Sequence, residues 1–294
     1  MVEINEVKAI NKLTTKDKFN SYKKNPASFC LFLLVVLAAV ITFATLLFLI
    51  GYILIKGVPH LTPSLFELKY TTENVSMLPA IINTIIMTLV SLAIAAPLGI
   101  FSAIYLVEYA KRGNWLVSVI RLTTETLSGI PSIVYGLFGL LFFVTKLNWQ
   151  YSILAGAFTL AIMILPLIIR TTEEALKSVP DSFREGSFGL GAGKLRTVFK
   201  VVLPSAVPGI LAGVILAIGR VVGETAALMY TSGSVAELPN SLMDSGRTLS
   251  VHMYALSSEG LYMNQAYATA VVLLIIVVGI NTLSGIVARR LVAN

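Results

Sequence analysis

The chain has 294 residues, of which 56% are hydrophobic and only 13% are charged. Because soluble domains carry about 25% charged residues, this composition excludes a soluble domain and indicates a polytopic membrane protein. The formal net charge of +7 does not indicate nucleic-acid binding, since the basic residues are distributed over several loops and form no single stripe. One cysteine, Cys30, excludes an intrachain disulfide. The two histidines lie apart from other ligand-type residues, so we assign no metal site and no cofactor.

The first part of the chain contains two apolar runs of membrane-spanning length. Residues 1–28 form a lysine-rich tail, which we expect to be solvated. Residues 29–55 are long enough to cross a hydrocarbon core of about 30 Å, so they predict a retained transmembrane helix rather than a cleaved signal peptide. A polar loop at 56–77 precedes a second predicted span at 78–107, in which Pro97 should produce a kink.

The third predicted span, 127–144, opens with a helix-breaking segment. Pro131 lacks a backbone donor and Gly129 lies beside it, so a break in the helix is expected there. A break would leave free N–H groups at a positive helix end, which can bind an anion, although a simple kink fits the physics equally well. The preceding stretch, 115–127, either lies along the membrane interface or begins this helix. The candidate pathway residues of this segment are Ser128, Gly129, Pro131 and Ser132.

Three further spans complete a predicted six-helix topology, at 152–169, 205–230 and 265–288. Six spans place both termini and the loops after the second and fourth spans on one side of the membrane. That side collects most of the 22 lysines and arginines. The opposite side holds only Lys56, Lys69, Lys146 and Arg247. The excess marks the cytoplasm, so both termini are predicted to be cytoplasmic.

One basic residue, Arg220, lies inside the fifth span, and Glu224 follows four residues later. In a continuous helix the two side chains share one face. A charge near the bilayer centre costs about 2.5–3.5 kcal/mol, so the pair indicates a polar cavity, with a structural ion pair between helices as the alternative. The planar guanidinium of Arg220 suits an oxyanion. Glu224 would hold Arg220 in place when no oxyanion is bound, or would accept a hydrogen bond from a protonated oxygen of the oxyanion. Gly219 and Gly223 allow close approach of a neighbouring helix.

A polar stretch at 181–204 separates the fourth and fifth spans. Asp181 and Ser182, directly after Pro180, are expected to cap a short helix, and Gly191 is a natural place for that helix to end. Its apolar side carries Phe183, Phe188 and Leu190. With no evident soluble domain to cover that side, we expect it to meet a partner protein; the alternative is a basic linker between two helices.

This stretch resembles the cytoplasmic loop of the integral membrane permeases of ATP-binding-cassette (ABC) importers. The family loop reads E-A-A, three residues, Gly, nine residues, then I-x-L-P. At the same spacing this chain has Glu185-Gly186-Ser187, then Gly191, then Val201-Val202-Leu203-Pro204. The substitutions for two alanines and an isoleucine are small or conserve shape. In the family the loop docks into the nucleotide-binding subunit and transmits its closure. The resemblance implies the same role for Arg184, Glu185, Gly186, Ser187, Gly191, Leu203 and Pro204.

Two other segments resemble phosphate-specific permeases of this family. One is the run from Ser128 to Gly136, and the other is Gly219-Arg220-x-x-Gly223-Glu224-Thr225-Ala226, which places Thr225 among the pathway candidates. The continuation Ala226-Ala227-Leu228 resembles the PstA type of subunit more than its PstC partner. The resemblance covers about 78–290, including a coupling loop at 170–204.

The resemblance implies an all-α fold of the type I ABC importer permeases (MetI-like), with six transmembrane helices in the cytoplasmic membrane. It implies inward transport of inorganic phosphate, driven by ATP hydrolysis on a separate subunit. The implied partners are a PstC-type permease, two copies of the ATP-binding subunit, an extracytoplasmic phosphate-binding protein and membrane lipid, but no nucleic acid. The glycines at 189–193 miss the spacing of a phosphate-binding loop, so no ATPase activity of the chain itself is expected.

Three other functions can be weighed against this one. A permease for sulfate or molybdate would share the coupling loop but is disfavoured by the segment from Gly219 to Ala226. An ion channel or secondary transporter would explain Arg220 and Glu224 but not the spacing from Glu185 to Pro204. A membrane-bound enzyme lacks candidate catalytic residues.

Overall fold

The computed structural model describes residues 26–111 and 113–292, and within them it contains helices and loops but no strand. The chain divides into residues 1–55 and 56–294, and each part is described by itself. Of the basic tail predicted at 1–28, residues 1–25 lie outside the described residues. The all-helical class expected from the sequence is confirmed for the described chain.

The first predicted span forms one uninterrupted helix, α2 (Pro26–Gly57). Its side chains are apolar on every face and mostly exposed, for example Leu34 and Phe43. A helix that is apolar all round is either a core helix or a membrane span. By its length and apolar composition α2 is a candidate membrane span.

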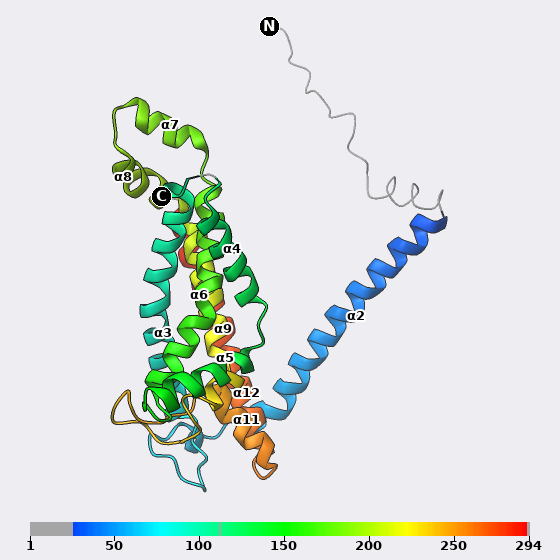
Figure 1. Ribbon diagram of the computed structural model, residues 1–294. Helices are drawn as coiled ribbons and strands as arrows, with labels where there is room; N and C mark the ends of the chain where they lie inside the picture. Colours follow the sequence, from blue (N-terminus) through cyan, green and yellow to red (C-terminus); the bar gives the residue numbers. More distant parts are fainter. Residues whose placement is uncertain (1–25, 112, 293–294) are drawn as a thin grey trace. The chain divides into compact units, whose positions relative to one another are not determined.

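The second part of the chain is a bundle in which four long helices run side by side (Figure 1). These are α3 (Leu78–Ile104), α6 (Ile153–Lys177), α9 (Leu203–Val222) and α12 (Met263–Val292). Helix α6 packs against both α3 and α9, and α12 packs against α9. Helix α3 continues through Pro97 and ends in a π-helical turn, Tyr105–Tyr109.

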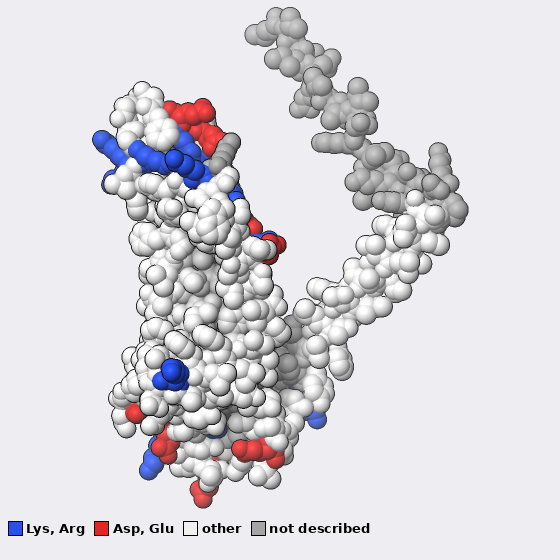
Figure 2. Space-filling model, viewed as in Figure 1, with Lys and Arg blue, Asp and Glu red and all other residues white. Residues whose placement is uncertain are grey.

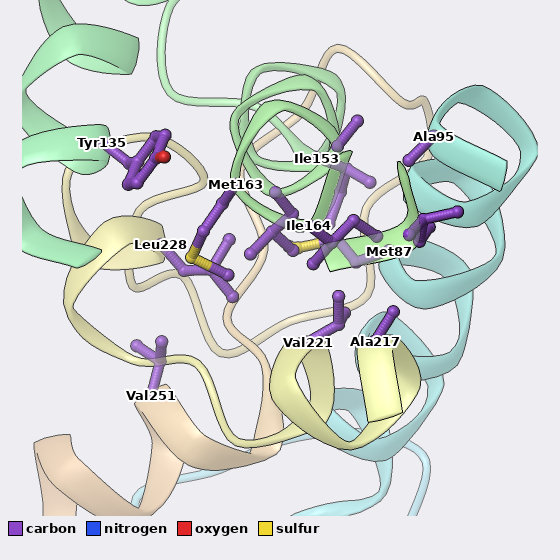
Figure 3. Close-up of a cluster of buried hydrophobic side chains, with 13 residues drawn as sticks. Met87, Ala95, Tyr135, Ile153, Met163, Ile164, Ala217, Val221, Leu228 and Val251 are labelled. Atoms are coloured by element: carbon purple, nitrogen blue, oxygen red, sulfur yellow. The ribbon is translucent and has the colours of Figure 1, made fainter. Parts of the chain in front are cut away.

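The core of the bundle is built around α6, which carries apolar residues on all faces. Figure 3 shows Ile153, Met163 and Ile164 of α6 in one cluster with Met87 of α3 and Val221 of α9. Each of these side chains is at most 2% exposed. Burial of such side chains is worth about 1.5–3 kcal/mol each in a soluble protein, whereas in lipid close packing supplies the stabilisation. The core therefore fixes α6 relative to the helices that carry the candidate site.

Shorter elements close the two ends of the bundle. One end carries α7 (Asp181–Gly189) and α8 (Lys194–Thr197), and the other carries α11 (Leu249–Glu259), as Figure 1 shows. Helix α8 passes through another π-helical turn, Val198–Val202, directly into α9. Other short elements are the 3-10 turns Val58–His60 and Pro63–Phe66 and the helix α10 (Ala226–Met229).

The third predicted span is not a single helix, which corrects the expectation at 127–144. Helix α4 (Trp115–Ser128) ends at Gly129, and α5 (Ser132–Gly139) begins after Pro131 and runs into a π-helical turn, Leu140–Lys146. The axes of the two parts differ by 103°. Pro131 supplies no backbone N–H, and its ψ of 141° is not helical, so the helix is interrupted at this residue. The predicted break is confirmed, and 115–128 is a separate helix that packs against α6.

Five helices of the described chain are long and apolar enough to cross a membrane, and the bent pair α4 and α5 makes six if it is one span. The expected count of six therefore depends on a broken span. Two helix ends also differ from expectation. Helix α6 continues beyond 169 to Lys177, and α9 ends at Val222 instead of 230.

Charged residues gather at the two ends of the bundle. On the face shown in Figure 2, most of the visible lysines and arginines lie at the end that carries α7 and α8, and the middle of the bundle is nearly free of charge. Such a band matches the hydrocarbon region of a bilayer. The C-terminal end of α12 lies at the same end as α7 and α8 (Figure 1).

Candidate substrate cavity and coupling helix

A cavity of about 430 Å³ lies where α4, α6 and α9 meet. Arg220 of α9 and Ser128 of α4 both line it, so two segments that are far apart in the sequence contribute to one site. Its charged wall residues are Arg121, Glu125, Arg170, Glu173, Glu174, Lys177 and Arg220. The cations outnumber the carboxylates, which favours an anionic ligand.

Arg220 lies in the last turn of α9, where the negative end of the helix dipole favours a cation. The residue is half-buried. Within the described chain no carboxylate lies within ion-pairing distance of its guanidinium, and no protein acceptor forms a hydrogen bond to it. The fork of Arg220 is therefore available to a ligand in the cavity.

The predicted pairing of Arg220 with Glu224 is wrong. Helix α9 ends at Val222 and Gly223 is its C-cap, so Glu224 does not continue the helical face. Instead its carboxylate Oε1 accepts a hydrogen bond of 3.0 Å from the backbone N–H of Ala227, at the start of α10. A carboxylate is stabilised at a helix N-terminus, and this contact accounts for the burial of Glu224, which has no basic partner among the described residues. The alternative of a structural ion pair between these two residues fails for the same reason.

The break between α4 and α5 is held by side-chain and backbone contacts. The Tyr135 hydroxyl donates to the carbonyl of Leu127 across the break, at 2.7 Å. Gly136 packs against Ala227 so closely that an added Cβ would lie 2.8 Å from the Ala227 Cα. The two segments that resemble phosphate-specific permeases therefore touch each other at this point.

The predicted pathway residues are only partly brought together. Ser128 lines the cavity with Arg220, and its hydroxyl donates to the carbonyl of Glu125 at 2.7 Å. The other candidates are not part of the cavity wall: Gly129, Pro131, Ser132, Gly219, Gly223, Glu224 and Thr225. For these residues a role in the pathway stays a prediction.

The coupling helix α7 ends as predicted but begins differently. Gly191 has φ +79°, and the backbone N–H groups of Gly191 and Ala192 donate to the carbonyls of Phe188 and Ser187. This paired closure is favoured by glycine in the left-handed region. At the other end Pro180 is the N-cap, and no side chain caps the helix. The expected capping by Asp181 and Ser182 is therefore wrong, because both are already helical.

One side of α7 exposes apolar surface. Phe183 is 49% exposed, Phe188 47% and Leu190 91%. Glu185 and Gly186 are exposed as well. Pro204 is exposed at the start of α9, and Leu203 is partly buried. The docking role of this surface stays a prediction, and its exposure is what docking requires.

Two predicted coupling residues point toward the rest of the chain. The Arg184 guanidinium donates to the Glu108 carboxylate at 2.7 and 3.1 Å, and to the carbonyls of Leu176 and Val179 at 2.9 and 2.8 Å. It also contacts Asp181 at 3.2 Å. Ser187 shares a hydrogen bond of 2.9 Å with Thr197 of α8. These contacts tie α7 to the ends of α3 and α6 and to α8.

The structure also contains an ion network that the sequence analysis missed. A single oxygen of Glu173, Oε1, lies 2.6 Å from Arg121 Nη2 and 2.7 Å from Lys177 Nζ. Glu174 pairs with Arg170 at 3.1 Å. The i,i+4 spacing within α6 was a visible signal for two of these contacts. No local spacing signals the contact between Arg121 of α4 and Glu173 of α6.

Comparison with known proteins decides the family. The family described as binding-protein-dependent transport system inner membrane component matches residues 95–293. The chain belongs to this family. The permease is 36% identical over 245 residues to the probable ABC transporter permease protein YqgI of Bacillus subtilis, covering 76% of this chain and 81% of that one. It is 33% identical over 275 residues to the phosphate transport system permease protein PstA of Yersinia pestis, covering 86% and 90%.

Solved structures agree on the fold of the permease. A bacterial alginate ABC transporter, solved in complex with an alginate pentasaccharide-bound periplasmic protein, superposes with a TM-score of 0.66 at 14% identity over 92% of this chain and 97% of that one. The MetNI methionine ABC transporter gives 0.57 at 19% identity, over 73% and 94%. The predicted ABC importer permease fold is confirmed, and the protein is a multi-pass membrane protein.

Proposed function

We propose that the permease carries inorganic phosphate inward across the cytoplasmic membrane, as one membrane subunit of an ATP-driven importer. The observation that carries the proposal is Arg220, which lines a cation-rich cavity and has no carboxylate partner among the described residues. A planar guanidinium binds oxyanion oxygens through two parallel hydrogen bonds. The similarity to a protein named as a phosphate transport system permease supports phosphate as that oxyanion.

The partners are inferred from surfaces that the single chain leaves uncovered. Cavity residues Arg170 and Glu174 have side chains that are 65% exposed. Because charges facing lipid are costly, we propose that a second permease of the PstC type covers this side. The apolar side of α7 would dock on one of two ATP-binding subunits, which supply the ATP hydrolysis. An extracytoplasmic phosphate-binding protein would deliver the anion to the opposite end.

The proposed orientation has both termini in the cytoplasm. The basic end that carries α7 and α8 would be cytoplasmic, in agreement with the enrichment of lysine and arginine in cytoplasmic loops. Cysteines introduced at Lys69 and Glu237 should then react with an impermeant reagent in intact cells, whereas one at Lys177 should not. The reverse labelling would contradict the orientation.

The decisive experiment is uptake of labelled phosphate by proteoliposomes that contain the assembled importer. We expect uptake to require ATP and the phosphate-binding protein, and excess sulfate or molybdate not to compete. Arg220→Lys should assemble normally but transport poorly, because an ammonium cannot reproduce the bidentate fork. Arg196→Lys, at an exposed position on α8 outside the cavity, is the matched control. Uptake of sulfate or molybdate in place of phosphate would support the alternative permease class.

A further inference from the structure

A second cavity, of about 490 Å³, lies between the first cavity and the coupling helix. Asp181 and Arg184 of α7 line its far wall. Leu106, Arg121 and Lys177 line both cavities. The two cavities therefore adjoin along the side chains of these three residues, which we call their boundary.

Glu173 joins the two cations of this boundary. Its Oε1 accepts from Arg121 at 2.6 Å and from Lys177 at 2.7 Å, and its side chain is 10% exposed. The side chains of Arg121 and Lys177 are 47% and 53% exposed. A guanidinium and an ammonium that converge on one oxygen present the arrangement that an oxyanion oxygen would take. The buried Glu173 carboxylate is thus an anion held between two accessible cations.

We propose that Arg121 and Lys177 form an exit subsite for the transported oxyanion, which Glu173 occupies when the subsite is empty. The inference rests on the proposed function and extends it from the cavity of Arg220 toward the cytoplasm. An oxyanion that leaves the first cavity exchanges with the Glu173 carboxylate, so the two cations are never without a counter-charge. When the anion moves into the second cavity, Glu173 returns and closes the boundary.

The second cavity is suited to receive the released anion. Its charged wall residues are Glu108, Lys111, Arg121, Lys177, Asp181 and Arg184, in which the cations again outnumber the carboxylates. Arg184 also holds the coupling helix, through its bonds to Glu108 and to the end of α6. A displacement of α7 therefore acts on a wall of the space into which the subsite opens.

The test measures passive leakage through the assembled importer. Proteoliposomes are loaded with labelled phosphate, and efflux is followed without ATP. Glu173→Gln removes the resident anion and leaves the two cations, so efflux should rise about tenfold, the factor that a single interaction of about 1.4 kcal/mol makes in an equilibrium. Glu259→Gln, an exposed carboxylate of α11 outside both cavities, should leave efflux at the wild-type rate.

A second variant covers the case in which Glu173→Gln does not assemble. Arg121→Gln changes a half-exposed side chain, and it should lower ATP-driven phosphate uptake at least about fivefold per complex with the ATPase rate retained. The subsite would be overturned if assembled Glu173→Gln showed wild-type efflux, or if Arg121→Gln took up phosphate within about twofold of the wild-type rate. Either result would leave Arg121 and Glu173 as a structural ion pair between α4 and α6. If wild-type vesicles take up no phosphate at all, it is the proposed function that fails.

Discussion

The contact between Arg184 and Glu108 provides the sharpest test of how the coupling helix is held. The guanidinium makes two bonds to the carboxylate and two to backbone carbonyls at the end of α6, and the side chains of Arg184 and Glu108 are 15% and 8% exposed. The change Arg184→Ala removes all of them. Hydrogen bonds to charged groups contribute about 1.5–3 kcal/mol each, but water can replace part of this set.

We call the contacts of Arg184 with Glu108 and with the end of α6 the anchor of α7. We take about 2 kcal/mol as its net contribution, which lies within the range for a single hydrogen bond to a charged group. Without the anchor, α7 must be ordered when the ATP-binding subunit docks, so the free energy of docking becomes less favourable by that amount. The association constant should fall about 30-fold. The measurement is titration of the ATP-binding subunit onto the permease pair in lipid nanodiscs.

Two controls separate anchoring from other effects of the substitution. Lys146→Ala removes an exposed basic residue outside the coupling loop 170–204 and should leave docking unchanged. The charge exchange Arg184→Glu with Glu108→Arg re-forms the ion pair without the bonds to α6, so it should recover part of the lost affinity. Docking of Arg184→Ala within about threefold of wild type, a difference of less than 1 kcal/mol, would refute the reasoning.

Three further changes address single positions. Gly191→Val places a β-branched side chain at φ +79° and should destabilise the end of α7 by about 1–2 kcal/mol, which is measurable as weaker docking with unchanged membrane insertion. Gly136→Ala sets a methyl group 2.8 Å from the Ala227 Cα; backbone must shift, at about 1–3 kcal/mol, and the midpoint temperature of the detergent-solubilised protein should fall. Burial and the neighbouring charge of Arg247 lower the pKa of His252 to about 3. The folded protein then binds fewer protons than the unfolded chain below pH ~6.5, so thermal stability should be full above that pH and decline as the pH falls toward 3, by up to about 1.4 kcal/mol per pH unit. His252→Phe should flatten this decline, and an equal slope in both proteins would exclude His252 as its cause.

The sequence predicts those features that depend on local chemistry. Apolar run length located the long helices, because a membrane span needs about 20 apolar residues. Pro131 located the break between α4 and α5, and Gly191 located the end of α7, because each residue restricts or permits a particular backbone conformation. These predictions needed no knowledge of the neighbouring helices.

The candidate site depends on packing that no local spacing reveals. The pairing of Arg220 with Glu224 assumed a continuous helix, but Gly223 ends α9 and Glu224 bonds to Ala227 instead. The contact between Arg121 and Glu173 joins two helices that meet only in the folded bundle. A sequence shows which charged residues are present, but it does not determine which of them form ion pairs in the folded cavity.

The π-helical turn at Tyr105–Tyr109 restricts how the length of the chain can vary at this place. A bond from residue i to i+5 accommodates one residue more than an α-helical turn, and one residue corresponds to about 100° of rotation around the axis. Glu108 lies in this turn and pairs with Arg184. Because this turn ends the helix, deletion of one residue before Glu108 would rotate that side chain by more than a quarter turn relative to α3, whereas a deletion in the loop after Lys146 would merely shorten a connection. In this family, insertions and deletions should therefore be rare at 105–109 and frequent in the loop.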